Sequence, residues 1–207
     1  MSTSRIGVLA LQGAFREHVS LLRRLGADAV EVRTPEELEH CIGLVLPGGE
    51  STTIGKLLVS SGLDTALQDY SGPLLGTCAG MILLAREARD GLPGQLLLGL
   101  IDIVVQRNGY GRQLHSFEAD VELEGDATPL HGVFIRAPRI ESVGAGAHIF
   151  AHLGGEPVAV EQGRAIATSF HPELAGETRV HERFLSALVR PTKQLSERQE
   201  EGERVSG

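Results

Sequence analysis

Short apolar runs of strand length alternate with helical segments through the first 90 residues of the chain. The strand-like runs are residues 5–11, 29–33, 42–46 and 73–76. Helical segments follow them at residues 14–25, 51–58, 63–70 and 79–88, and residues 34–37 (Thr-Pro-Glu-Glu) are typical of a helix start. Strands connected by helices form parallel sheets that the helices cover. The sequence therefore predicts an open, mostly parallel sheet with helices on both faces.

The second half of the chain differs, with several strand-like runs and little helical patterning between them. Strands are predicted at residues 98–105, 116–124 and 132–136, and a closing helix at 178–189. Gly163-Arg164 separates the apolar runs 157–162 and 165–170, which predicts a β-hairpin. We therefore expect an α/β, flavodoxin-like fold of three layers with an added β-hairpin. A single domain is predicted over residues 1–190, followed by a flexible polar tail at 191–207.

Charge and composition exclude several classes of partner. The formal net charge is −8, and no basic stripe with interleaved aromatic residues is present, so we expect no nucleic-acid partner. No apolar run reaches the length of a transmembrane helix, so we expect no membrane association. The two cysteines, Cys41 and Cys78, do not form a disulfide framework. These features predict a cytoplasmic protein in a reducing compartment.

A cysteine between two glycines follows the fourth predicted strand, in the stretch Gly76-Thr77-Cys78-Ala79-Gly80. This pattern is the thiol form of the G-x-S-x-G nucleophile elbow. The sharp turn needs small neighbours, the helix N-terminus favours a thiolate, and the Ala79 N–H can receive an oxyanion. The alternative is a buried structural cysteine, which is the commoner role of a lone cysteine. Cys41 begins an apolar strand without turn glycines, and that structural role is predicted for it.

A nucleophilic thiol needs a base, and the chain has eight histidines. Three of them lie in helical segments among charged residues, and we expect them on the surface: His18, His40 and His181. His148 and His152 lack the cysteine or carboxylate partners of a metal site, so no metal is expected. His171 differs because it directly follows a predicted strand, and Glu173 lies two residues further on. A carboxylate at that spacing can hold the imidazole in one tautomer, although a polar loop has the same residues.

The third predicted strand ends in the sequence LPGGES, at residues 46–51. Taken alone, Pro-Gly-Gly indicates a turn. In a parallel sheet, however, ligands bind beyond the carboxyl ends of the strands, and glycines allow backbone N–H groups to approach a ligand closely. Residues 48–51 lie at such an end and open a helix, so their amides are candidates for contact with an anion.

Together, the glycine-rich loop, the elbow and the late His-Pro-Glu resemble the class I (triad) glutamine amidotransferases. Five stretches are similar, in order and spacing, to the glutaminase subunits of pyridoxal 5′-phosphate synthases: LALQGAFREH (9–18), LPGGESTT (46–53), QRNGYGRQLHSFEAD (106–120), GVFIRAP (132–138) and SFHPEL (169–174). The similarity covers roughly residues 5–190. The resemblance implies the fold of the class I glutamine amidotransferases.

The resemblance also implies roles for residues at matching positions. Cys78 would be the nucleophile, His171 the base and Glu173 the group that orients it. The N–H groups of Gly49 and Ala79 would form the oxyanion hole. The residues that would bind glutamine are Gly49, Glu50, Ser51, Arg107, Ile135 and Arg136. Arginine suits the α-carboxylate of glutamine because a guanidinium offers paired donors.

The implied reaction is hydrolysis of L-glutamine to L-glutamate and ammonia through a γ-glutamyl thioester, without a cofactor. The implied partner is a (β/α)₈-barrel synthase subunit, in a large hetero-oligomer, that receives the ammonia and builds the pyridoxal ring. Residues 12–18 are predicted to contact this partner, and the isolated subunit is expected to be poorly active.

Three other functions remain open at this point. The chain could be the glutaminase of another synthase, such as that of the histidine pathway, against which the GRQ-x-x-SFE stretch (residues 111–118) argues. It could be a non-catalytic member of the fold whose cysteine senses oxidation, although a sensor needs no ordered base. A cysteine peptidase would share the acyl chemistry.

Overall fold

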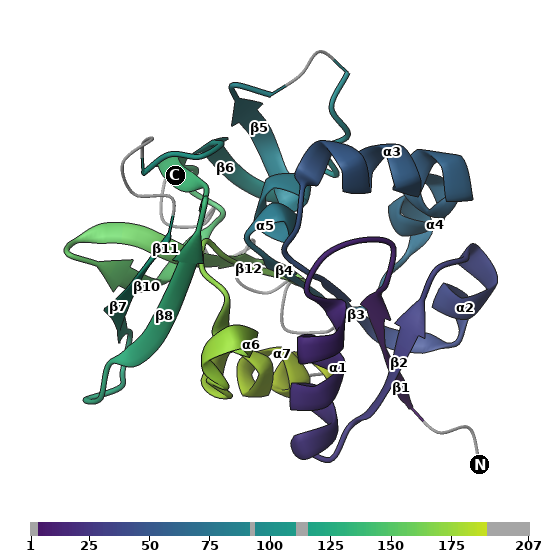
Figure 1. The fold of residues 1–207 in the computed structure, drawn as a ribbon, viewed down its shortest axis with the longest axis horizontal. Helices are drawn as coiled ribbons and strands as arrows, with labels where there is room; N and C mark the ends of the chain where they lie inside the picture. The colour runs from purple at the N-terminus through teal and green to yellow at the C-terminus, as the bar shows by residue number, and fades with distance from the viewer. Residues whose placement is uncertain (1–3, 92–93, 111–115, 190–207) are drawn as a thin grey trace, which may run out of the picture.

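The computed structural model describes residues 4–91, 94–110 and 116–189, and Figure 1 shows its fold. In these parts of the chain, nine strands form one sheet in the order β2-β1-β3-β4-β12-β11-β10-β7-β8. Its first five strands are parallel: β2 (Asp28–Val32), β1 (Arg5–Leu9), β3 (Cys41–Leu46), β4 (Leu74–Thr77) and β12 (Ala165–Thr168). All the strands predicted in the first 76 residues are thereby confirmed within two residues.

The other four strands extend this sheet in antiparallel fashion: β11 (Glu156–Gln162), β10 (His148–Leu153), β7 (Ser116–Leu123) and β8 (Leu130–Ile135). The predicted hairpin is confirmed, because β11 and β12 pair directly across Gly163. This hairpin connects the antiparallel strands to the parallel part of the sheet. The mixed α/β class with helices on both faces of a large sheet agrees with the prediction.

Three further strands of the described chain form a small second sheet: β5 (Ala85–Arg89), β6 (Ile101–Gln106) and β9 (Arg139–Val143). The prediction of one helix over residues 79–88 is wrong, because α5 (Ala79–Leu84) ends where β5 begins. Residues 85–88 suit a helix locally, but pairing with β6 gives their backbone groups partners. The strand predicted from residue 98 starts later, since the Leu98 and Leu100 N–H groups donate to the last carbonyls of α5.

Helices cover both faces of the parallel strands (Figure 1). One face has α1 (Phe15–Arg24), α6 (Pro172–Ala175) and α7 (Arg179–Val189), and the other has α2 (Pro35–Glu39), α3 (Ser51–Ser61), α4 (Leu63–Asp69) and α5. Strand side chains alternate between two cores. Leu44 and Leu46 join the core under α3, α4 and α5, whereas Val45 joins the core under α1 and α7. The helix start predicted at residues 34–37 is confirmed, and Thr34 and Glu37 form a capping box at the start of α2.

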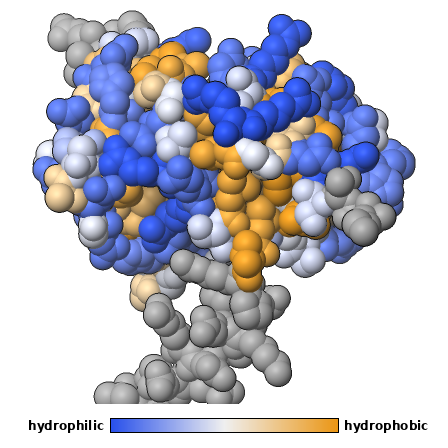
Figure 2. All heavy atoms as spheres, turned by 90° about the horizontal axis from the view of Figure 1, so that it is seen from below, coloured by the Kyte–Doolittle hydropathy of each residue, from blue (hydrophilic) through white to orange (hydrophobic). Residues whose placement is uncertain are grey.

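The face seen from below is mostly hydrophilic, with a hydrophobic band near its centre and smaller hydrophobic areas beside it (Figure 2). The large hydrophobic side chains exposed in the described residues are Ile42, Val59, Ile135, Leu174 and Val189. None of the helices found in the described residues is both long and apolar enough to cross a membrane. The predicted tail at 191–207 and residues 111–115 of the motif at 106–120 lie outside the described residues.

Candidate active site

The predicted elbow is a strained turn between β4 and α5. Cys78 has φ 50° and ψ −102°, a conformation that residues other than glycine rarely adopt. Its N–H donates to the Thr168 carbonyl at 2.8 Å, which anchors the turn to β12. A Cβ atom on Gly76 would lie 2.6 Å from the Gly80 carbonyl oxygen, and one on Gly80 would overlap the Leu46 carbonyl oxygen. The spacing of glycines around the cysteine is therefore a packing requirement of this turn.

His171 follows β12 and stands at the N-terminus of α6. Its Nδ1 lies 2.7 Å from Glu173 Oε1, and its backbone N–H donates to the Val133 carbonyl of β8 at 2.8 Å. A Cβ on Gly48 would overlap the imidazole ring, so the PGGES loop packs directly against His171. This contact explains why a glycine occupies position 48.

The environment of the pair favours a charged carboxylate and a charged ring. Burial lowers the pKa of His171, but interactions with Cys78 and Glu173 outweigh burial and raise that pKa to about 10. Burial raises the pKa of Glu173, but His18 and His171 act more strongly together and hold it well below its usual range. The structure thus brings Cys78, His171 and Glu173 together in a buried group.

The end of β8 lies beside the cysteine. Cys78 Sγ is 3.7 Å from the Ile135 carbonyl oxygen, and Arg136 has φ 44°, an uncommon conformation for a residue with a side chain. Cys78 and His171 are each 5% exposed. Ile135 and Arg136, for which the family resemblance implies a role in glutamine binding, therefore lie next to the predicted nucleophile.

A second polar network forms where α3 begins. Glu50 caps this helix by accepting hydrogen bonds from the Thr52 and Thr53 N–H groups at 3.1 and 2.7 Å. Arg107 donates to Glu50 Oε1 at 2.9 Å and to Gln95 Oε1 at 3.2 Å. Gln95 in turn donates to Ser51 Oγ at 3.2 Å. The structure thus brings together three predicted glutamine-binding residues, and adds Gln95.

The charge of Glu50 is fixed by this network. Burial raises the pKa of Glu50, but hydrogen bonds from Thr53 and Thr52 lower it to about 2. Glu50 is therefore ionised throughout the neutral range, and it holds the Arg107 guanidinium beside the helix start.

Residues 12–14 hold the loop that contains Gly49. Gln12 Oε1 accepts a hydrogen bond from the Glu50 N–H at 2.9 Å, and the Ala14 N–H donates to the Gly48 carbonyl at 3.1 Å. A Cβ on Gly13 would overlap that same carbonyl oxygen. The first loop of the chain therefore sets the orientation of the Gly48–Gly49 peptide.

The expectation that His18 and His181 lie on the surface is wrong. Both are fully buried, between α1 and α7, and His18 reaches Glu173. The signal was present in the sequence: His18 is three residues after Phe15 and four before Leu22, on the apolar side of the helix. No comparable signal marks Gln95, which lies outside helices and strands and is far from Ser51 in sequence.

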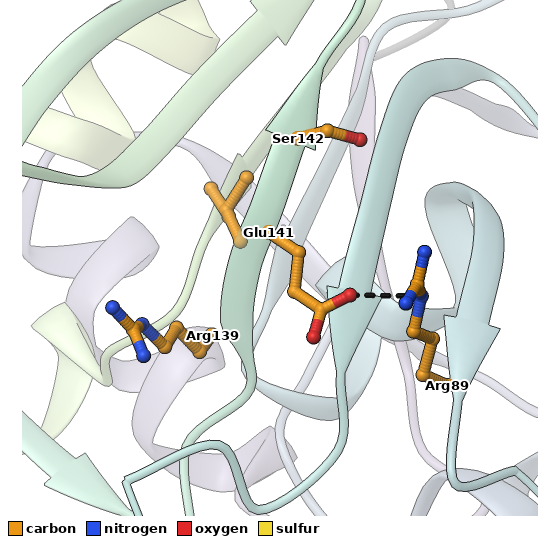
Figure 3. Close-up of a pocket in the computed structure, with 5 residues that line it drawn as sticks. Arg89, Arg139, Glu141 and Ser142 are labelled. Atoms are coloured by element: carbon orange, nitrogen blue, oxygen red, sulfur yellow. Dashed lines mark ion pairs between the residues drawn. The ribbon is translucent and has the colours of Figure 1, made fainter.

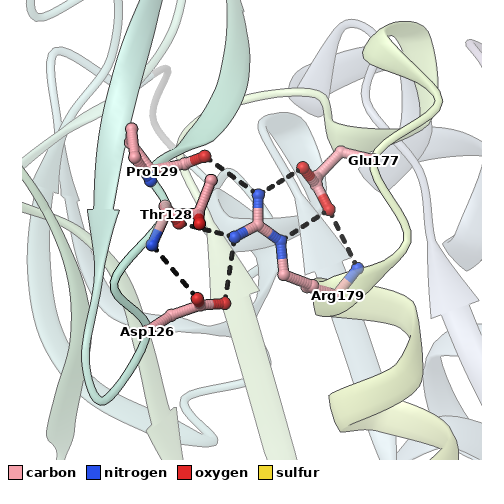
Figure 4. Close-up of polar contacts among 5 residues, drawn as sticks. All are labelled: Asp126, Thr128, Pro129, Glu177 and Arg179. Atoms are coloured by element: carbon pink, nitrogen blue, oxygen red, sulfur yellow. Dashed lines mark hydrogen bonds and ion pairs between the residues drawn. The ribbon is translucent and has the colours of Figure 1, made fainter.

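An arginine links the α6–α7 connection to the turn between β7 and β8 (Figure 4). Arg179 donates to the carbonyls of Thr128 and Pro129 at 2.7 and 3.1 Å, and pairs with Asp126 and Glu177. Since β8 leads to Ile135 and α6 contains Glu173, this cluster holds the two sides of the site against one another.

A separate hollow of about 460 Å³ lies over the small sheet (Figure 3). It is lined by Arg89, Arg139, Ile140, Glu141 and Ser142, and Arg89 pairs with Glu141 at 2.8 Å. None of its lining residues belongs to the predicted site, so it gives no reason to relocate that site.

Several solved structures share this fold. A crystal structure described as a glutamine amidotransferase superposes with a TM-score of 0.83, at 50% identity, over 88% of this chain and 98% of that one. The structure of PurLQS from Thermotoga maritima shares the fold alone, with a TM-score of 0.63 at 14% identity over 90% and 99% of the two chains. The chain therefore has the fold of a glutamine amidotransferase.

The chain belongs to the SNO glutamine amidotransferase family, whose model matches residues 8–190. It is 56% identical to the pyridoxal 5′-phosphate synthase subunit PdxT of Parafrankia sp. (strain EAN1pec), over 91% of this chain and 95% of that protein. It is 55% identical to PdxT of Streptomyces coelicolor, over the same shares of the two chains.

Proposed function

We propose that the chain is the glutaminase subunit of a pyridoxal 5′-phosphate synthase, and that it hydrolyses L-glutamine to L-glutamate and ammonia. The observation that supports this most is the strained Cys78 turn beside the buried His171–Glu173 pair, in a chain that the family model matches almost throughout. The ammonia passes to a (β/α)₈-barrel synthase subunit, in a large hetero-oligomer of the cytoplasm.

In the proposed reaction, His171 acts as a base and then as an acid. Glu173 Oε1 accepts a hydrogen bond from Nδ1–H of His171, so Nε2 is the nitrogen that exchanges a proton with the thiol. His171 takes the Cys78 proton, and the thiolate attacks the amide carbon of glutamine. The raised pKa of His171 stabilises the protonated ring, which then gives its proton to the departing ammonia.

The second half of the reaction restores the enzyme. Water loses a proton to His171 and attacks the γ-glutamyl thioester, and the thiolate leaves and regains that proton. In both halves, the N–H groups of Gly49 and Ala79 stabilise the oxyanion. Ala79 begins α5 directly after the nucleophile, in the place where an elbow supplies such a donor.

The second network supplies the proposed glutamine site. Arg107 and Arg136 offer guanidinium donors for the α-carboxylate, and Glu50 offers a carboxylate for the α-ammonium group. Gly49, Ser51 and Ile135 line the side-chain path toward Cys78. Glu50 is already held by Arg107 and the α3 N–H groups, so little ordering is required when glutamine binds.

The proposal is tested by measuring glutamate and ammonia release from glutamine, with and without the barrel subunit. We expect release that rises strongly when the two subunits are mixed. Cys78→Ala is expected to abolish it while the complex still forms in size-exclusion chromatography. Cys41→Ala is the matched control, since Cys41 is a buried cysteine at the start of β3, and it is expected to keep full activity. Full ammonia release by Cys78→Ala would overturn the assignment.

A further inference from the structure

Two buried histidines stand behind the Cys78–His171–Glu173 group and have no part in the mechanism above. His18 belongs to α1 and His181 to α7, and both side chains are fully buried. His18 Nδ1 lies 2.8 Å from His181 Nε2. Burying two polar rings costs free energy unless they are hydrogen-bonded, so an apolar pair would fill this space more readily. The positions of their nitrogen atoms indicate a more specific role.

The other nitrogen of His18 faces two oxygens. His18 Nε2 lies 3.1 Å from Thr77 Oγ1 and 3.4 Å from Glu173 Oε2. An ionised carboxylate only accepts hydrogen bonds, so it favours the tautomer with the proton on Nε2. The second oxygen of Glu173 has no hydrogen bond of good geometry among the described residues, which makes His18 the group that faces it.

His181 completes the arrangement from the far side. Burial is the main cause that lowers the pKa of His181 to about 3, so its ring is neutral. A neutral His181 can donate from Nε2 to the bare Nδ1 of His18, which keeps the His18 proton on Nε2. A row of side chains thus connects α7, α1 and α6 to the elbow: His181, His18, Glu173, His171 and Cys78.

We propose that His18 is a positioning residue for the triad, which holds Glu173 Oε2 so that Oε1 stays on His171 Nδ1. His181 holds His18 in the required tautomer. Thr77, which directly precedes the nucleophile, ties the same ring to the elbow. This inference rests on the proposed glutaminase function and extends it by two residues that do not touch the substrate.

The positioning role of His18 predicts a change in the pH profile of kcat/KM. The titratable groups that act on Glu173 are His171 from its own segment, His18 from α1 and His181 from α7, with Cys78 beyond His171. The Nε2–H of His18, which faces Glu173 Oε2, lowers the pKa of Glu173. Removing that donor raises the pKa of Glu173, so the acid limb of kcat/KM moves to higher pH.

Two variants of one position separate positioning from packing. In His18→Gln, the amide nitrogen reaches the place of Nε2 and can face Glu173 Oε2. In His18→Asn, the amide reaches only the place of Nδ1. Both are measured in the complex with the barrel subunit, for kcat, KM, the pH profile of kcat/KM and the melting temperature. We expect His18→Asn to lose kcat about 10- to 100-fold with KM within twofold, and His18→Gln to recover most of that loss.

The outcomes distinguish this inference from the proposed function. If the unaltered chain releases no ammonia, or Cys78→Ala releases it fully, the glutaminase assignment fails. If that assignment holds but His18→Asn matches the unaltered chain, or both His18 variants lose activity equally and in step with melting temperature, His18 is a packing residue and the inference is overturned.

Discussion

Two polar networks meet at the carboxyl ends of the parallel strands, and they differ in how much water reaches them. The first, here called the triad network, contains Cys78, His171, Glu173 and His18. In it, the side chains of His18 and Glu173 are fully buried and that of His171 is 7% exposed. The second, here called the loop network, is the group of Glu50, Arg107, Gln95 and Ser51 at the start of α3. In it, the Glu50 side chain is 47% exposed and that of Arg107 is 16% exposed. A buried charge depends on its partners because water does not replace them. We therefore expect the triad network to fix the reacting groups, and the loop network to tolerate exchange with a ligand.

The largest effect is expected from the carboxylate of the buried network. Glu173→Gln removes the charge that holds the His171 tautomer, and its amide can donate to Nδ1 instead of accepting from it. We expect kcat to fall by about 10³-fold or more. The measurement is glutamate release by the complex at saturating glutamine, with circular dichroism as a check on folding. A variant that keeps more than a tenth of the original kcat would show that the two networks do not differ in this way.

A smaller effect is expected from the matching change in the exposed network. Glu50→Gln loses the charge that pairs with Arg107, while an amide oxygen can still cap α3. A hydrogen bond between charged groups is worth about 1.5–3 kcal/mol, so we expect kcat/KM to fall roughly 10- to 100-fold. The loss should lie mainly in KM, which a glutamine titration measures. A loss confined to kcat would mean that Glu50 acts on the reaction and not on binding.

The smallest effect concerns stability and pH. The pKa of His181 is lowered to about 3 from its ordinary 6.5, so below pH 6.5 the unfolded chain binds a proton that the folded chain excludes. Stability from this ring is therefore lost as pH falls below 6.5. The pKa of His171 is raised to about 10, so the stability that it contributes is present below pH 6.5 and is lost as pH rises toward 10.

This dependence is measured by urea unfolding between pH 5 and pH 6.5, where Glu173 is ionised in the folded chain. His181→Gln keeps a donor for His18 but does not titrate, and it serves as the comparison. We expect the free energy of unfolding to fall more steeply for the unaltered chain, by up to about 1 kcal/mol per pH unit. Equal slopes in the two proteins would mean that His181 is protonated in the folded state.

The same comparison shows what the sequence could predict and what it could not. The parallel strands were predictable because they are short apolar runs bounded by turns, and Cys78 because its glycines have a fixed spacing. His18 was misplaced because charged neighbours suggested a surface position, although its spacing from Phe15 and Leu22 indicated the core. Gln95 could not be found, because its contact with Ser51 is set by tertiary packing. Helix α5 ends early for a similar reason, since the pairing of β5 with β6 overrides local preference.

Strands β4 and β12 are direct neighbours in the sheet, yet they are far apart in the chain. Thr77 pairs with Thr168, so the elbow after β4 and His171 after β12 are placed by one parallel ladder. The segment between these strands builds the second sheet and all four strands of the antiparallel extension. That segment leaves the parallel part of the sheet after β4 and returns to it at β12, the neighbouring strand. This segment can therefore change in length and sequence while Cys78 and His171 keep their separation.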